Sequence, residues 1–159
     1  MMAESISFRG SLTQATLKEA QKIVDGWSAH PFMVQLARAI CSAARAKTPI
    51  QEDSAIHAFV RDRVEYRGDP VMAEWVQDPF ETMIVSRAGD CDDMAVSVAT
   101  LLQAIGHPCR VAAIEWAGRG VYSHCVAIDK KTNKVVDAIA PNLEPWPSHS
   151  VKVQAILEA

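Results

Sequence analysis

The sequence lacks several features that would assign it to a specialised class of protein. It has no apolar run near the ~20 residues of a membrane-spanning helix, no basic stretch leading into an apolar segment at its start, and no repeats or low-complexity segments. Its 16 lysine and arginine residues are outnumbered by 19 aspartates and glutamates, and a net charge of −3 gives no dominant attraction for nucleic acid. We therefore expect a cytoplasmic protein without a secretory signal, which binds neither a membrane nor a nucleic acid.

The four cysteines also lack the spacing of a disulfide framework or a zinc site. None of them forms a CxxC pair, and in a reducing compartment they are expected to be thiols. Cys41, Cys109 and Cys125 lie in apolar segments, which predicts core positions. Cys91 lies among aspartates, which is poor core chemistry, and this predicts a reactive role.

The length and composition are those of one globular domain. The chain has 159 residues, of which 49% are hydrophobic and 22% charged. We predict a single domain over 1–159, in which 1–47 form an N-terminal helical extension. Residues 48–140 form the core, and 141–159 form a C-terminal loop with a possible last strand.

The order of the predicted elements is several helices followed by an antiparallel meander, so the predicted fold class is α+β. Residues 1–10 are predicted to be a frayed terminus, and 67–88 a long ordered excursion with one short helix at 72–76. Apolar spacing and capping residues predict helices over 12–24 (ended by Gly26), 31–47, 49–66 (capped by Thr48) and 91–105 (capped by Asp90 and Asp93). Strand-like segments are 110–116, 121–129, 134–140 and 151–157.

Cys91 falls in the first turn of the last predicted helix, where unpaired N–H groups and the helix dipole favour a thiolate. The neighbouring Asp90, Asp92 and Asp93 oppose a thiolate, because like charges repel. A cationic partner would have to outweigh them, and histidine is the usual one.

The strand-like segments supply such a partner. A four-residue turn over 130–133 would pair Asp129 with Lys134 and place His124 on the same face as Asp137, diagonally across the two strands. We therefore predict that Cys91 is a nucleophile, His124 a general base and acid, and Asp137 the residue that orients His124.

An oxyanion formed in such a reaction needs hydrogen-bond donors. The backbone N–H of Cys91 is the natural first donor, and Gln77 in the long excursion is our second candidate. Trp75, Trp116 and Tyr122 are predicted to line a substrate groove, and Trp146 is a further candidate for it. Packing in the core or at its rim is the alternative for each of the three tryptophans. His107 is predicted to be a capping or surface residue, while His30, His57 and His149 have no evident partners.

Several segments together resemble the transglutaminase-like superfamily, and most of all its bacterial and phage cysteine peptidases. They are residues 88–95 (AGDCDDMA), 101–110 (LLQAIGHPCR), 122–126 (YSHCV) and 135–138 (VVDA), with weaker likeness at 59–66, 69–70 and 76–79. The resemblance implies a papain-like α+β core, with the cysteine at a helix N-terminus packed on an antiparallel sheet. It also implies a catalytic triad of Cys91, His124 and Asp137.

The resemblance leaves two functions open. One is a thiol enzyme that needs no cofactor and hydrolyses a peptide or amide bond of a peptide or protein substrate, with glutamine–amine transfer as a variant. The other is a catalytically silent binding or assembly module, for instance in a phage or prophage particle. No metal site is predicted, because helix capping accounts for the aspartates around Cys91 better than a calcium loop does.

Overall fold

Three helices form the first part of the chain. The structure is a computed structural model, which describes residues 2–68 and 76–159, with side chains from residue 14 onward. The helices are α1 (Met2–Trp27), α2 (Pro31–Ala43) and α3 (Pro49–Arg63).

Proline and capping side chains fix where α2 and α3 begin. Pro31 and Pro49 each occupy a first-turn position, where the missing N–H costs nothing. The His30 ring accepts a hydrogen bond from the N–H of Phe32, and Thr48 Oγ1 accepts one from the N–H of Gln51. The predicted start of α3 at Thr48 is thus confirmed.

A short parallel pair closes the excursion that follows α3. Strand β1 (Glu65–Tyr66) pairs with β2 (Ala88–Gly89), and between them lies a widened helical turn, η1 (Glu81–Val85). This pairing brings the chain back beside the end of α3 just before α4 (Cys91–Ala104) begins.

The second half of the chain forms one antiparallel sheet. Its strands are β3 (Cys109–Trp116), β4 (Tyr122–Asp129), β5 (Lys134–Val136) and β6 (Val153–Glu158), in the order β5-β4-β3-β6. The β4–β5 turn pairs Asp129 with Lys134, as the four-residue turn predicted.

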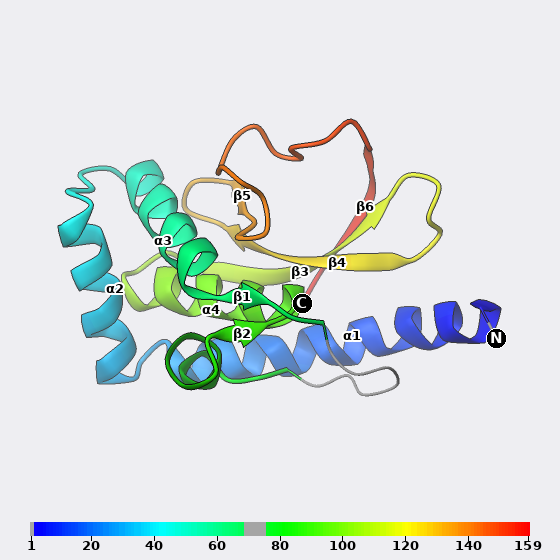
Figure 1. Cartoon of the computed structure of the whole chain (residues 1–159), viewed down its shortest axis with the longest axis horizontal. Helices are drawn as coiled ribbons and strands as arrows, with labels where there is room; N and C mark the ends of the chain where they lie inside the picture. Colours follow the sequence, from blue (N-terminus) through cyan, green and yellow to red (C-terminus); the bar gives the residue numbers. More distant parts are fainter. Residues whose placement is uncertain (1, 69–75) are drawn as a thin grey trace.

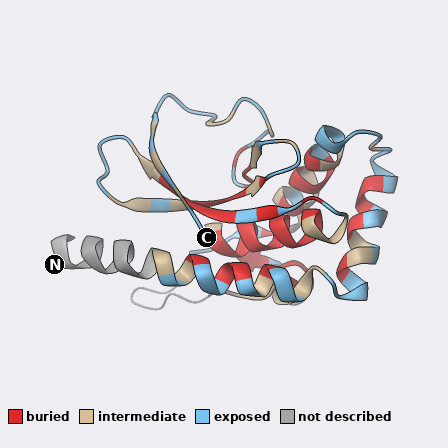
Figure 2. Cartoon of the chain, turned by 180° about the vertical axis from the view of Figure 1, so that it is seen from behind, coloured by how far each residue is buried: buried red, intermediate tan, exposed pale blue. Residues whose placement is uncertain are grey.

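Helix α4 is the centre of the core. It packs against α1, α2 and α3 on one side and against β3 and β4 on the other, and Figures 1 and 2 show it enclosed between the helices and the sheet. Its residues from Asp92 to Leu102 are all buried. A helix that is buried nearly all round fixes the position of its own first residue, Cys91, against the sheet.

The other face of the sheet carries a smaller apolar cluster. Ala112, Ile114 and Val126 are its buried members, and Trp116 and Trp146 pack against them. Trp146 comes from the loop between β5 and β6, which arches over this face of the sheet (Figure 1).

The α+β class, the antiparallel sheet and the N-terminal helices are confirmed, whereas several boundaries are wrong. Residues 2–10 are helical rather than frayed, because α1 begins at Met2 and continues through Gly26 to Trp27. Helices α2 and α3 end earlier than predicted, and the third strand stops at Val136 because the chain turns there to present Asp137. The short helix predicted at 72–76 lies almost wholly outside the described residues. None of the helices in the described ranges has the length and apolarity needed to cross a bilayer.

Gly89 offers a test of how tightly the start of α4 is packed. A Cβ at Gly89 would lie 2.6 Å from Cβ and 2.9 Å from Oδ2 of Asp93, closer than real side chains approach. We expect Gly89→Ala to lower the free energy of unfolding by about 1–3 kcal/mol, the usual cost of overpacking, in urea titrations followed by tryptophan fluorescence.

Gly26→Ala is the matched control. A Cβ at Gly26 meets nothing within 4 Å, and alanine is favoured over glycine in a helix by about 1 kcal/mol. We expect this variant to be at least as stable as the wild type. Equal stability of the two variants would contradict the packing argument.

Candidate active site

The N-terminus of α4 holds Cys91 in a fixed place. Asp90 is the N-cap: its side chain accepts a hydrogen bond from the N–H of Asp93, and the Asp93 carboxylate accepts one from the N–H of Asp90 at 3.1 Å. This reciprocal capping box, predicted from the sequence, makes Cys91 the first helical residue. The backbone N–H of Cys125 donates to the Cys91 sulfur, so the thiol lies against β4 beside the residue that follows His124.

The surroundings of Cys91 favour the neutral thiol. Burial raises the pKa of Cys91 well above its usual range, and the negative charges of Asp92 and Asp90 raise it further. The hydrogen bond from Cys125 lowers the pKa but does not compensate. Burial and the neighbouring aspartates therefore raise the pKa of Cys91 by more than the helix N-terminus lowers it. In the free protein Cys91 is a thiol rather than a thiolate at neutral pH.

His124 and Asp137 form a dyad. His124 Nε2 lies 2.7 Å from Asp137 Oδ2, which confirms the diagonal contact predicted from strand alternation. Donation from Nε2 to the carboxylate leaves Nδ1 as the ring nitrogen that can accept a proton. In the described part of the chain, no hydrogen bond joins the Cys91 thiol to His124. Hydrogen bonds of this kind commonly form only when substrate binds.

Asp137 has two further donors. Trp146 Nε1 donates to Oδ2 at 3.0 Å, and the N–H of Ile139 donates to Oδ1 at 3.1 Å. Burial raises the pKa of Asp137, but the hydrogen bonds from His124, Trp146 and Ile139 outweigh it, and the net pKa is lowered. Asp137 therefore stays ionised and can orient and stabilise the imidazole ring.

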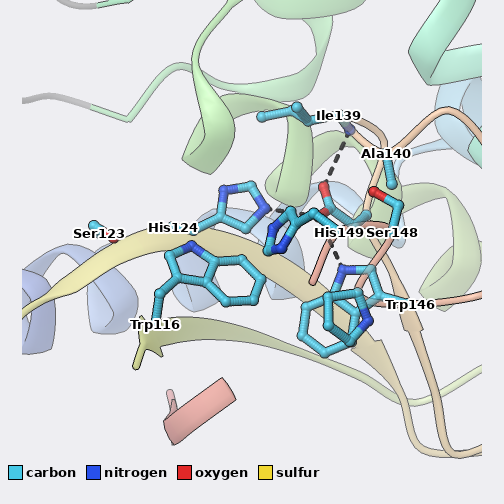
Figure 3. A pocket seen from close by; sticks show the side chains of 10 residues that line it. Trp116, Ser123, His124, Ile139, Ala140, Trp146, Ser148 and His149 are labelled. Carbon is cyan, nitrogen blue, oxygen red and sulfur yellow. Dashed lines mark hydrogen bonds and ion pairs between the residues drawn. The ribbon is translucent and has the colours of Figure 1, made fainter. Parts of the chain in front are cut away.

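A pocket of about 260 Å³ opens over this dyad. His124 and Asp137 lie in its wall, and Trp116, Trp146 and His149 provide its aromatic surface (Figure 3). The rings of Trp116 and His124 are stacked with centroids 5.9 Å apart, which limits the rotation of the imidazole. Cys91 does not line this pocket.

The predicted groove residues differ in their positions. Trp116 lines the pocket. Tyr122 instead packs against the main core. Trp75 lies outside the described residues.

Gln77, the second candidate oxyanion donor, is tied to the helix cap. Its backbone N–H donates to Asp93 Oδ1 at 2.8 Å, and its side-chain amide donates to Asp93 Oδ2 at 3.1 Å. Burial raises the pKa of Asp93 to about 7 despite the hydrogen bond from the Gln77 backbone. Gln77 therefore lies beside the Cys91 helix terminus, and its role towards an oxyanion stays a prediction.

Four histidines have partners that the sequence interpretation did not predict. The His30 ring caps α2, and the His149 ring lies with its centroid 4.6 Å from that of Trp116. His57 was assigned no partner, yet it is buried in α3 and its Nε2 lies 2.9 Å from the carbonyl oxygen of Asp137 and 3.0 Å from that of Ala140. His107 was assigned to a cap or the surface, yet it is fully buried and both of its ring nitrogens contact carboxylates. The sequence also gave no indication that Trp146 is a hydrogen-bond donor to Asp137.

Comparison with known proteins identifies the class. A cysteine at a helix N-terminus, packed on an antiparallel sheet beside a His–Asp pair, fits a papain-like α+β fold. Residues 34–138 match the transglutaminase-like superfamily, and the chain belongs to that superfamily. The match begins within α2, upstream of the predicted core boundary at residue 48. No curated protein matches the chain.

Solved structures share the fold. A candidate cysteine protease from Cytophaga hutchinsonii has a TM-score of 0.54 and 20% identity, covering 78% of this chain and 42% of its own. Calcium-bound LapG from Legionella pneumophila has a TM-score of 0.58 and 16% identity, covering 91% of this chain and 88% of its own. A candidate protease from Parabacteroides distasonis has a TM-score of 0.56 and 14% identity, covering 79% of this chain and 26% of its own. At these identities the likeness establishes the fold.

The aspartates at the start of α4 lie close enough together to be considered as cation ligands, and one of the LapG structures holds calcium. Asp90, Asp92 and Asp93 each place a carboxylate oxygen within 4.8 Å of the others. Both oxygens of Asp93 already accept hydrogen bonds, from Gln77 and from the N–H of Asp90. Calcium needs six to eight oxygen ligands, so these side chains fit a helix cap better than a calcium site.

The lowered pKa of Asp137 has a consequence for stability. A carboxylate with a pKa below its unfolded value stabilises the fold above that value, 3.8, and loses this contribution as the pH falls through the lowered pKa. We expect the stability difference between wild type and Asp137→Asn to shrink as the pH falls below about 4, in urea titrations at stepped pH.

The double variant with His124→Ala is the control. His124 provides the largest stabilisation of the Asp137 carboxylate, so Asp137→Asn should change the pH dependence less in that background. A stability difference that does not vary with pH would contradict the assignment.

Proposed function

We propose that the protein is a thiol-dependent acyl-transfer enzyme that hydrolyses a peptide or amide bond. The observation that carries the proposal is the His124–Asp137 pair at 2.7 Å beside the strand residue whose N–H donates to the Cys91 sulfur. The substrate is a peptide or protein, and no cofactor takes part. The four free thiols fit a reducing compartment such as the cytoplasm.

In the proposed reaction His124 acts as a general base during attack rather than as a permanent imidazolium. The Cys91 S–H proton passes to His124 Nδ1 while the sulfur bonds to the substrate carbonyl carbon. Proton transfer during the attack, rather than before it, suits a thiol whose pKa is raised by burial and by Asp92. Asp137 accepts from Nε2 and stabilises the imidazolium as it forms.

The later steps return the proton. The backbone N–H of Cys91, with Gln77 as the second candidate, stabilises the oxyanion. His124 then protonates the leaving amine as the C–N bond breaks, which leaves a thioester on Cys91. Water attacks the thioester with His124 again as base, and the carboxylic acid and the free thiol are released.

Turnover of peptide and amide libraries tests this proposal. We expect Cys91→Ala to lower kcat/KM by at least about 1,000-fold and His124→Ala to do so comparably, because residues that act as a unit fail together. Cys41→Ala, which removes a buried thiol of α2, is the matched control and should retain turnover. Undiminished turnover in Cys91→Ala would refute the proposal.

Two observations favour a second candidate, a catalytically silent binding or assembly module, for instance in a phage or prophage particle. The pKa of Cys91 is raised by burial, and the pocket over the dyad does not include this thiol. A binding module needs no reactive sulfur. Absence of turnover, together with equal binding of a partner by the wild type and Cys91→Ala, would favour this candidate.

A further inference from the structure

A second cluster of polar side chains is buried at the opposite end of β4 from His124. Asp53 comes from α3, His107 from the loop after α4, and Asp129 from the last position of β4. All three side chains are 0% exposed. Asp129 is five positions beyond His124 along β4, which is roughly 16 Å at ~3.3 Å per residue, so this cluster is distinct from the candidate active site.

Three atoms of the cluster converge. His107 Nδ1 lies 2.5 Å from Asp129 Oδ2 and 3.8 Å from Asp53 Oδ1, and all three atoms lie within 4.8 Å of one another. No N–H or O–H group of another described residue donates to Asp53 Oδ1; the carboxyl group of Asp53 instead approaches that of Asp129, and burial together with Asp129 raises the pKa of Asp53. Two carboxyl groups buried this close together cannot both be charged unless a proton or a cation lies between them.

The remaining polar atoms of these side chains have partners of their own. Glu52 Oε2 lies 2.5 Å from His107 Nε2, Thr132 Oγ1 donates to Asp53 Oδ2 at 2.6 Å, and the N–H of Lys131 donates to Asp129 Oδ1 at 2.7 Å. Metal-binding histidines usually donate their second ring N–H to a carboxylate, and metal-binding carboxylates are themselves hydrogen-bonded. The cluster has this complete set of outer partners.

The negative charge of the cluster also needs a positive charge to balance it. Four acidic or imidazole groups meet here, and within the described ranges no lysine or arginine forms an ion pair with Glu52, Asp53 or Asp129. A buried carboxylate pair needs a compensating positive charge, which only a proton or a metal ion can provide in this space.

We propose that Asp53, His107 and Asp129 bind a divalent cation of the Zn²⁺ class, with Glu52 orienting His107. One imidazole nitrogen and two carboxylate oxygens suit a first-row transition ion, whereas calcium prefers six to eight oxygens. In the ion-free protein a hydrogen bond joins His107 Nδ1 to Asp129 Oδ2 at 2.5 Å. The ion replaces the proton of this bond, which is released to solvent, and bonds to Nδ1 and Oδ2 while Nε2–H donates to Glu52. Water completes the coordination. It cross-links α3 to the turn between β4 and β5 and is a structural ion.

Zn²⁺ titration of the full chain, stripped with a chelator, tests the proposal. The Cys91→Ala background removes the candidate nucleophile as a competing ligand. We expect saturable binding of one Zn²⁺ per chain by calorimetry and a rise in Tm that grows with the Zn²⁺ concentration. Added Asp53→Asn should weaken binding at least about 100-fold, since it removes a charged ligand and preserves its shape.

Two further variants make the outcome decisive. Glu52→Gln, at a side chain 28% exposed, should weaken Zn²⁺ binding about 10- to 100-fold, and it serves if Asp53→Asn fails to fold. Asp92→Asn, at the other acidic cluster, should leave binding unchanged. Absence of saturable binding, or binding that survives Asp53→Asn and is lost in Asp92→Asn, would overturn the proposal.

Discussion

The reciprocal hydrogen bonds between Asp90 and Asp93 are the interaction on which the rest of the site depends. They end the extended chain of β2 and begin α4, which leaves Cys91 as the first helical residue. The same Asp93 carboxylate binds Gln77, so the excursion between β1 and β2 is attached to the helix terminus as well. Only glycine fits at position 89, because any side chain there would collide with Asp93.

The sheet side of the site is held from both of its faces. Trp146 reaches Asp137 from the loop over the outer face, and His57 reaches the Asp137 carbonyl from α3 on the inner side. Burial lowers the pKa of His57, so it is neutral and donates from Nε2 to two carbonyl oxygens. The chain after β5 is therefore fixed to the helical layer, and the carboxylate that is hydrogen-bonded to His124 has little freedom to move.

Capping residues and turn lengths correctly predicted those features of the structure that depend only on residues close together in the sequence. The capping pattern around Cys91 placed the start of α4, and the four-residue turn after Asp129 gave the register that brings His124 to Asp137. The strand ended at Val136 rather than at residue 140, because the carbonyls of Asp137 and Ala140 bond to His57 instead of a neighbouring strand.

Contacts between distant segments escaped the sequence interpretation. Asp53 and His57 fall at the spacing of the apolar stripe of α3, with Ile56 and Val60, and polar residues on such a stripe indicate buried partners. The identity of those partners depends on the tertiary fold. Trp146 belongs to a loop with no periodic pattern, so no local signal connects it with Asp137 nine residues earlier.

Covalent acylation of Cys91 with the help of His124 is the step that the proposed function cannot do without. The most direct test is intact-protein mass spectrometry after mixing with an activated peptide ester, followed by mapping of the modified cysteine. We expect a transient adduct on Cys91 alone that decays as the product is released, and that forms far more slowly in His124→Ala. An adduct on the other cysteines at the same rate, or equal acylation of Cys91 in His124→Ala, would contradict it.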